Sequence, residues 1–465
     1  MEMNLDKHII NYNKQRKIKD ADSLCYAPSK SLFFRKNGDI GVCCNNREYV
    51  LGKYPQDSIA SVLNGEKLSK LKDSLKDNDF SLGCGLCKQQ IINGNYANCV
   101  ANYYDDLPLF ENIPSILEFE LDNICNLECE MCFGKFSSLI EKNREEKAAS
   151  KCLYDKTFIE QITPYLSNLR KTTFLGGEPF LIDIYYEIWE KLIEINPNCE
   201  LFVQTNGTIL NPKIKKLLEK GNFELNLSLD SLIPEVYKGI RQNASLSTVL
   251  ANLDYFLEYA KQKNKIIGCS VCILRENINE IPSLMEFCSE NNMYVYFNMV
   301  SYPIQFSLDY LSSAYLKQLI EMLESYQAIP TNELENRNLK HYNGLISHFK
   351  QREIFMMNHE NILSENISII NIENQQVSEL LQEFDKKIQC FIKTLEPNLS
   401  EIFINADGLY KLKMALQNQS SDFPLYRVIK YIVEKIPIEI IVDDLIKEPL
   451  DVIQEKIRVI SFDVI

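Results

Sequence analysis

Three cysteines within eight residues carry the clearest chemical signal in this sequence. They are Cys125, Cys129 and Cys132, in the run Cys-Asn-Leu-Glu-Cys-Glu-Met-Cys. An iron–sulfur cube normally takes four thiolates, so a three-thiolate loop can hold a [4Fe–4S] cluster and leave one iron without a protein ligand. The alternatives are a zinc site or a set of buried structural thiols. Structural zinc prefers four ligands in paired C-x2-C spacing, and no fourth Cys or His lies close by in sequence.

The segments around this loop predict a parallel sheet. Residues 115–303 alternate short apolar segments with helical patterns, and six segments are typical of strands: 116–121, 172–175, 201–205, 223–229, 266–274 and 294–300. Helices are expected at 209–220, 246–261 and 281–291. Strands that alternate with helices predict an α/β fold, here a six-stranded partial (β/α)6 barrel or an open doubly wound sheet. Ligands bind at the carboxyl ends of such strands, and the cysteine loop follows the first strand directly.

Two of the expected strands carry polar residues at every second position. These residues are Glu118, Glu120 and Asp122 in the first strand, and Asn226, Ser228 and Asp230 in the fourth. Successive side chains of a strand point to opposite faces, so one face of the sheet should be polar and the other apolar. For Glu118 the alternative is a solvated edge strand. For Asp230 it is a cap on the following helix.

These motifs together are similar to those of the radical S-adenosylmethionine (SAM) superfamily, in which a C-x3-C-x2-C loop holds the cluster that binds SAM. The second strand ends in Gly-Gly-Glu-Pro, which resembles the GGE motif of that superfamily. By this resemblance, Gly176, Gly177 and Glu178 bind the amino group of SAM. The resemblance also assigns SAM contacts to polar residues at the ends of later strands, namely Thr205, Asn206, Ser228 and Asp230. Asn298, near the end of the sixth strand, could contact SAM or the substrate, and an ordinary surface or packing residue is the alternative.

The fifth expected strand carries two cysteines, Cys269 and Cys272. Residues three apart on a strand point to opposite faces, so at most one of these thiols faces the polar side. By resemblance to some radical epimerases, that thiol could donate a hydrogen atom to a substrate radical. A buried, inert cysteine is the alternative.

A second set of cysteines lies in residues 23–100. Cys25 and Cys43 are far apart in sequence, and Cys84 and Cys87 form a C-x2-C pair. This arrangement resembles a SPASM/Twitch module, in which four thiolates hold an auxiliary [4Fe–4S] cluster. Zinc bound by the same four thiolates is the alternative. The remaining cysteines suffice for the one-cluster form only, and in most relatives the module follows the barrel, whereas here it precedes it.

Composition limits the remaining possibilities. The chain has 465 residues, 64 acidic against 50 basic, which disfavours a nucleic-acid surface. Fifteen cysteines, an odd number, without an export signal favour a reducing cytoplasm over a disulfide framework. We see no apolar run of membrane-spanning length. The expected division is a flexible arm at 1–22, the cysteine-rich module at 23–100, the core at 115–303 and a mainly helical domain at 304–465. In that last domain we expect helices at 311–326 and 377–393 and a strand at 438–442.

The resemblance implies an oxidoreductase or maturase that uses two [4Fe–4S] clusters. It would cleave SAM reductively to a 5′-deoxyadenosyl radical, which takes a hydrogen atom from a substrate. The first expectation is a peptide or protein substrate, as in the maturation of a peptide natural product, with flavodoxin or ferredoxin as reductant. Alternatives are a small molecule such as an amino sugar, an iron–sulfur scaffold or electron-transfer protein, and RNA methylthiolation, which the acidic balance disfavours.

Overall fold

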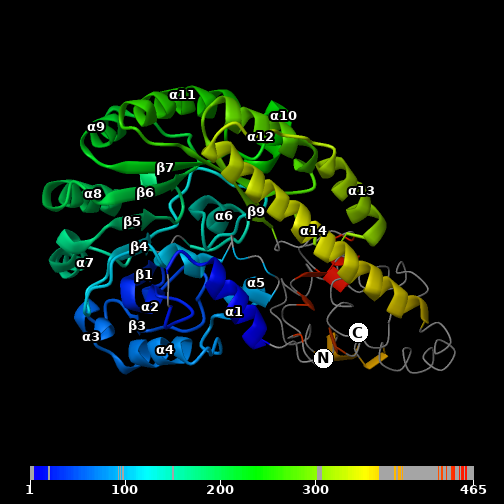
Figure 1. Cartoon of the computed structure of the whole chain (residues 1–465), viewed down its shortest axis with the longest axis horizontal. Helices are drawn as coiled ribbons and strands as arrows, with labels where there is room; N and C mark the ends of the chain where they lie inside the picture. Colours follow the sequence, from blue (N-terminus) through cyan, green and yellow to red (C-terminus); the bar gives the residue numbers. More distant parts are fainter. Residues whose placement is uncertain are drawn as a thin grey trace. The chain divides into compact units, whose positions relative to one another are not determined.

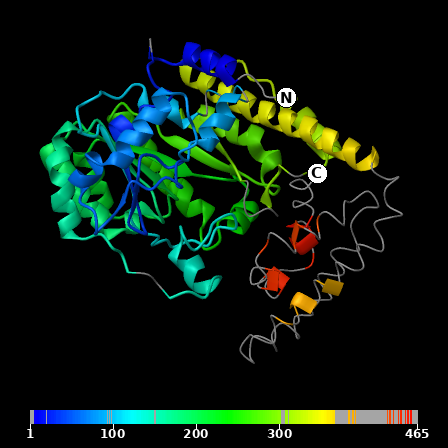
Figure 2. The same cartoon turned by 90° about the horizontal axis from the view of Figure 1, so that it is seen from below.

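The computed structural model describes residues 5–365, except 19–20, 93, 95, 97–98, 149–150, 301–305 and 310, and scattered positions between 382 and 457. The contacts of the chain divide it into two compact units. Figures 1 and 2 show the described helices and strands from two directions. The first comprises residues 1–272, 280–298 and 328–344, and the second comprises residues 273–279, 299–327 and 345–465.

The main element is a mixed sheet with the strand order β3-β2-β1-β4-β5-β6-β7-β8-β9 (Figure 1). Its strands are β1 (Ser31–Arg35), β2 (Asp39–Gly41), β3 (Gly52–Lys53), β4 (Ile116–Glu120), β5 (Lys171–Phe174), β6 (Glu200–Thr205), β7 (Phe223–Ser228), β8 (Gly268–Ile273) and β9 (Tyr294–Met299). The six strands expected from the sequence are present as β4–β9. The sheet nevertheless has nine strands, because β1 of the cysteine-rich module pairs in parallel with β4, with Phe33 opposite Glu118.

Helices cover one face of this sheet. They are α7 (Lys156–Ile162), α8 (Asp183–Ile195), α9 (Pro212–Lys220), α11 (Leu246–Gln262) and α12 (Ile281–Glu290), and the last three confirm the expected helices. Trp189 of α8 is fully buried, with its ring 5.2 Å from Phe174 of β5 and 5.6 Å from Phe223 of β7. Such aromatic contacts dominate core packing, and they identify the apolar face of the sheet as the helix-covered one.

The opposite face, here called the inner face, is polar as the alternation predicts. Asn226 of β7 donates to Gln204 of β6 and to Ser270 of β8, at 2.7 Å in both cases. Glu118 is only 4% exposed and accepts from Ser31 of β1 and from Tyr104. The solvated edge strand considered for Glu118 is therefore wrong, because β1 covers the edge of β4.

The N-terminal segment corrects the expected flexible arm at 1–22. Residues Leu5–Gln15 form helix α1, in which Ile9 and Tyr12 are buried, and Arg16 directly after it is buried as well. The helix was not expected because most of its residues are polar. The buried residues Ile9, Tyr12 and Arg16 are spaced three and four apart, which is the spacing of residues on one face of a helix. The module also contains α2 (Ala27–Lys30), α3 (Ile59–Leu63), α4 (Glu66–Lys76), α5 (Gly85–Ile92) and the 3-10 helix η2 (Val100–Tyr104).

In the second unit, α13 (Ser313–Glu324) matches the helix expected at 311–326. Helix α14 (Glu333–Glu365) begins in residues of the first unit and continues into those of the second. Of the helix expected at 377–393, only some positions are described, and these are helical. The strand expected at 438–442 is wrong at Ile441 and Val442, which are helical, since short apolar runs do not distinguish strand from helix. Positions 438–440 lie outside the described residues. No helix in the described part of the chain is long and apolar enough to cross a membrane.

Candidate functional site

The loop of Cys125, Cys129 and Cys132 follows β4 and is held by backbone bonds to the end of helix α10 (Pro234–Ile240). The N–H of Glu130 donates to the carbonyl of Ile240 at 2.9 Å, and the N–H of Glu128 donates to that of Gln242 at 3.2 Å. The loop has almost no regular secondary structure, so these bonds determine its path. They place the loop beside the end of α10, where Arg241 lies next to Cys129.

Burial and two arginines set the electrostatics of these thiols. Burial raises the pKa of Cys125 to about 12 and that of Cys132 to about 11, and the neighbouring thiols add to both shifts. The Arg241 guanidinium lies 4.0 Å from the Cys129 sulfur and opposes the rise in the pKa of Cys129 that burial causes. Arg144 donates to the carbonyl of Cys129 at 3.2 Å. The free thiols are therefore protonated at neutral pH, and the site holds cations that can balance thiolate charge.

The two glycines after β5 let the cysteine loop approach closely. Gly176 has φ +114°, and a Cβ there would collide with the carbonyl oxygen of Asp122. A Cβ on Gly177 would collide with the carbonyl of Ile124, the residue before Cys125. The N–H groups of Gly177 and Glu178 donate to these two carbonyls, at 3.1 and 2.8 Å. Both glycines thus pack against the cysteine loop, and their contact with SAM stays a prediction.

Glu178 is fully buried and forms hydrogen bonds with two other predicted site residues, Thr205 and Asn206. Its carboxylate accepts from the Thr205 hydroxyl at 2.8 Å, from the Asn206 N–H at 2.7 Å and from the Phe180 N–H at 3.1 Å. Asn206 in turn donates to Asn126 of the cysteine loop at 3.0 Å. Burial raises the pKa of Glu178 to about 7 in spite of these hydrogen bonds, so the carboxyl is close to half protonated at neutral pH.

The other predicted residues differ in their surroundings. Ser228 accepts from Gln204 at 2.8 Å on the inner face. Asp230 forms a 2.6 Å ion pair with Arg241 and accepts from the N–H of Cys272, so it binds an arginine and is not a helix cap. No hydrogen bond within the described residues joins Asn298 to this group. Arg241 was missed, because it belongs to no motif and only the fold brings it to the cysteine loop.

The four cysteines of the N-terminal module line one apolar cavity. Cys25, Cys43, Cys84 and Cys87 all contribute to its walls, together with residues such as Leu24, Phe80, Ile91 and Tyr104. Cys44 and Cys99, which the sequence left unassigned, are not among the lining residues. Four thiols that are scattered over 63 positions of the sequence thus meet in one place.

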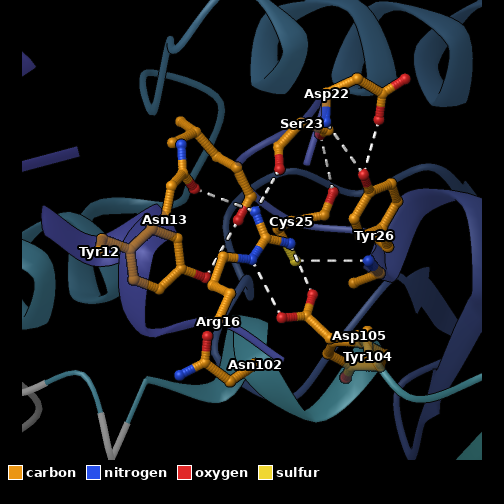
Figure 3. A network of polar contacts seen from close by, with 12 residues as sticks. Tyr12, Asn13, Arg16, Asp22, Ser23, Cys25, Tyr26, Asn102, Tyr104 and Asp105 are labelled. Atoms are coloured by element: carbon orange, nitrogen blue, oxygen red, sulfur yellow. Dashed lines mark hydrogen bonds and ion pairs between the residues drawn. The ribbon is translucent and has the colours of Figure 1, made fainter. Parts of the chain in front are cut away.

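Each of these four thiols receives hydrogen bonds. The Ala27 N–H donates to Cys25 at 3.3 Å (Figure 3), and the Asn46 N–H donates to Cys43 at 3.3 Å. The Asn46 amide donates to Cys84 at 3.6 Å. Hydrogen bonds from Cys99 and from the backbone of residues 100 and 101 lower the pKa of Cys87 to about 7. Donors aimed at sulfur stabilise thiolates, which are the form that binds metal.

Comparisons with known proteins agree with this geometry. Residues 120–288 match the family model of the radical SAM superfamily. The chain carries a radical SAM domain. Residues 25–89 match SPASM, an iron–sulfur cluster-binding domain, which stands N-terminal to it. These two domains imply [4Fe–4S] clusters and SAM as cofactors.

Curated relatives resemble the radical SAM domain over part of their length. A GTP 3′,8-cyclase of Sulfurovum sp. (strain NBC37-1) is 28% identical over 178 residues, covering 37% of this chain and 51% of the relative. One of Limosilactobacillus fermentum (strain NBRC 3956 / LMG 18251) is 27% identical over 190 residues, covering 40% of this chain and 54% of the relative. The chain therefore spans about half the length of the curated relatives that it matches.

Solved structures are more distant. "Native anSMEcpe with bound AdoMet" shares 20% identity at a TM-score of 0.34, over 45% of this chain and 60% of that one. "Crystal structure of Streptococcus suis SuiB" shares 18% identity at a TM-score of 0.35, over 56% of each chain. Likenesses of this size carry no information on substrate.

The residues of the radical SAM loop fit a [4Fe–4S] cluster. Three thiols on one loop, of which Cys129 is buried and the other two are half-buried, offer the ligands, and Arg241 beside Cys129 offers a balancing charge. Among the described residues, no three His, Cys, Asp or Glu side chains are close enough to share a single metal ion. A cube takes its thiolates on different irons, which spreads them apart. In the N-terminal module, the four cysteines that line one cavity and the hydrogen bonds that they receive fit a [4Fe–4S] cluster as well.

The two cysteines of β8 point to opposite faces, as strand geometry requires. Cys269 faces α12 and forms a hydrogen bond with Cys288, on the helix-covered face. Cys272 faces Asp230 and Arg241 and is close enough to Cys129 for the charges to interact. Of the two, only Cys272 lies on the side of the radical SAM loop.

Proposed function

We propose that this radical SAM enzyme cleaves SAM reductively and abstracts a hydrogen atom from a peptide or protein substrate. When bound at Cys125, Cys129 and Cys132, the cluster supplies the electron that splits SAM into methionine and a 5′-deoxyadenosyl radical. The observation that carries the proposal is a chain of two hydrogen bonds between this loop and Glu178. Asn206 donates through its side chain to Asn126 of the loop and through its backbone N–H to the Glu178 carboxylate. It puts a buried carboxylate, able to accept from an ammonium group, next to the loop.

The chain's own residues would orient SAM and balance charge. Glu178 would accept from the amino group of SAM, and Thr205 and Asn206 would hold its carboxylate in place. Ser228, on the inner face, would contact the ribose or the carboxylate of SAM. Arg241 would balance the negative charge of the cluster while Asp230 holds its guanidinium in position.

The auxiliary site would hold a second [4Fe–4S] cluster on Cys25, Cys43, Cys84 and Cys87. Tyr104 connects this site with the inner face, because it lines the cysteine cavity and its hydroxyl donates to Glu118 at 2.6 Å. When bound there, the auxiliary cluster would supply an electron acceptor for the substrate radical, and Tyr104 and Glu118 would link its site to the inner face. Flavodoxin or ferredoxin would supply the reducing electrons, in a reducing compartment such as the cytoplasm.

The charges of the inner face favour a peptide over a nucleotide. Three cations among the described residues on or beside this face are paired with carboxylates: Arg47 with Glu120, Lys171 with Glu200 and Glu224, and Arg241 with Asp230. A triphosphate such as GTP, which the relatives' names indicate, requires several cations to bind its oxygens. Because these cations are already paired with carboxylates and Glu118 adds a further carboxyl, the inner face favours a substrate without the negative charge of a triphosphate.

The test is anaerobic incubation of the reconstituted enzyme with dithionite and SAM. Formation of 5′-deoxyadenosine and methionine would support the proposal. A fully clustered enzyme that forms neither product would instead be an iron–sulfur scaffold or an electron-transfer protein. Deuterium transfer from labelled peptide candidates, from GTP or from amino sugars into 5′-deoxyadenosine then distinguishes the substrate classes.

A further inference from the structure

A buried ion pair joins Arg16, which directly follows helix α1, to Asp105, which directly follows η2 (Figure 3). Arg16 donates through Nε and Nη2 to both carboxylate oxygens of Asp105, at 3.0 and 2.6 Å. The side chains are 0% and 1% exposed. The rings of Tyr12 and Tyr26 lie 5.2 and 5.3 Å from the guanidinium carbon. This guanidinium is therefore enclosed and held by two hydrogen bonds to one carboxylate.

The groups that Arg16 joins belong to two separate walls of the cysteine cavity. Its Nη1 donates to the carbonyl of Ser23 at 2.5 Å, two residues before Cys25. Asp105 directly follows η2, which contributes Val100, Ala101 and Tyr104 to the cavity. The backbone of Val100 and Ala101 also forms hydrogen bonds with the Cys87 thiol. Arg16 thus connects the wall that carries Cys25 with the wall that supports Cys87.

The helix itself reinforces the first of these walls. The Tyr12 hydroxyl donates to the carbonyl of Leu24, a residue that lines the cavity, at 3.2 Å. On the second wall, Lys30 donates to the carbonyls of Tyr104 and Asp105, at 2.8 and 3.2 Å. Helix α1 and Arg16 lie outside the matched SPASM residues 25–89, yet they contact both sides of its cavity.

We propose that Arg16 is a positioning residue for the auxiliary cluster, and that its ion pair with Asp105 sets the separation of the walls bearing Cys25 and Cys87. The proposal rests on the auxiliary cluster of the proposed function. The proposal implies that residues 5–16, which precede the matched SPASM residues, support the cluster site of that domain.

The chain offers a matched control for this pair. Lys17 and Asp106 form an ion pair between the same two segments, one residue further along each, but their side chains are 77% and 57% exposed. Exposed pairs contribute little, whereas removal of one partner from a buried pair leaves an unpaired charge. Arg16→Lys keeps the charge but cannot keep the two-point contact with Asp105.

The experiment compares wild type, Arg16→Lys, Arg16→Met and Lys17→Met after anaerobic reconstitution. Wild type and Lys17→Met should hold about eight irons per chain, four per cluster. Both Arg16 variants should keep the electron paramagnetic resonance (EPR) signal of the radical SAM cluster. Their auxiliary cluster should be lost or shifted in midpoint potential, more in Arg16→Met than in Arg16→Lys. An unchanged auxiliary signal and potential in both Arg16 variants would overturn the proposal.

A second readout needs no cluster. In the cluster-free protein, Cys25 and Cys87 of Arg16→Lys should react with iodoacetamide several-fold faster than in Lys17→Met, because the cavity walls separate more often. Equal alkylation rates in Arg16→Lys and Lys17→Met would overturn the proposed role of Arg16, even if Arg16→Met fails to fold. A wild type that holds only one cluster would instead contradict the proposed auxiliary cluster, and the alkylation rates would still test the role of Arg16.

Discussion

Glu178 should make SAM affinity depend on pH. Its carboxyl is fully buried, and burial raises its pKa to about 7. The carboxylate accepts from the ammonium group of SAM much more strongly than the protonated carboxyl does, so SAM binding should favour loss of the proton. With a pKa of about 7, the apparent affinity should fall roughly eightfold from about pH 7.5 to about pH 6.0. Well below pH 7 the loss should approach about tenfold per pH unit.

The assay is anaerobic titration calorimetry of SAM into reconstituted wild type and Glu178→Gln. The range stops near pH 7.5, because α-amino groups lose their proton at about pH 7.7–8.0. The glutamine cannot ionise, and its amide nitrogen would face the Asn206 N–H, which now donates to the carboxylate. Hydrogen bonds to charged groups contribute about 1.5–3 kcal/mol, so the variant should bind SAM roughly 10- to 150-fold more weakly at pH 7.5. Its affinity should not vary over the range.

Two results would refute this reasoning. Wild-type affinity that stays constant between the two pH limits would show that Glu178 does not titrate there or does not contact SAM. A pH slope in Glu178→Gln equal to that of wild type would assign the titration to another group.

Three further predictions concern the clusters and the buried charges. Cys129→Ala should abolish SAM cleavage, whereas Cys84→Ala should still cleave SAM but form no product. Chromatography of 5′-deoxyadenosine and of the product measures both effects, and full turnover by Cys84→Ala would exclude a role of the auxiliary cluster in product formation. Burial raises the pKa of Glu118 to about 7 from 4.5, so its contribution to stability is present below pH 4.5 and is lost as the pH rises through 7. From about pH 6 to about pH 8, cluster-free wild type should lose roughly 1 kcal/mol of unfolding free energy that Glu118→Gln keeps, as urea titrations can show; equal losses would contradict the shift. Asp230→Asn leaves Arg241 buried without its counter-charge and should cost about 3–5 kcal/mol by the same titration, and a loss below about 1 kcal/mol would contradict the buried pair.

Local patterns were sufficient to predict the core strands. The alternation around Glu118 and Asn226 identified both strands and the polar face, because the period of two depends only on strand geometry. The resemblance to a SPASM/Twitch module named four thiols for one site in the N-terminal module, and these four do line one cavity.

Long-range contacts could not be predicted in this way. The pairing of β1 with β4 joins segments that are about 85 residues apart and leaves no local period, so the nine-stranded sheet was missed. The same holds for Arg241, which reaches Cys129 across 112 positions. Arg16 was read as part of a polar arm, because the sequence does not show that Asp105 is buried beside it.

The central claim is that the cluster held by Cys125, Cys129 and Cys132 has one iron without a protein ligand, and that SAM binds this iron. EPR spectroscopy of reduced Cys84→Ala, with and without SAM, tests it most directly. This variant should retain the radical SAM cluster alone. A [4Fe–4S] signal whose g-values change when SAM is added would show that SAM binds the cluster. Bound zinc without a cubane signal, or a cubane signal that SAM leaves unchanged, would contradict it.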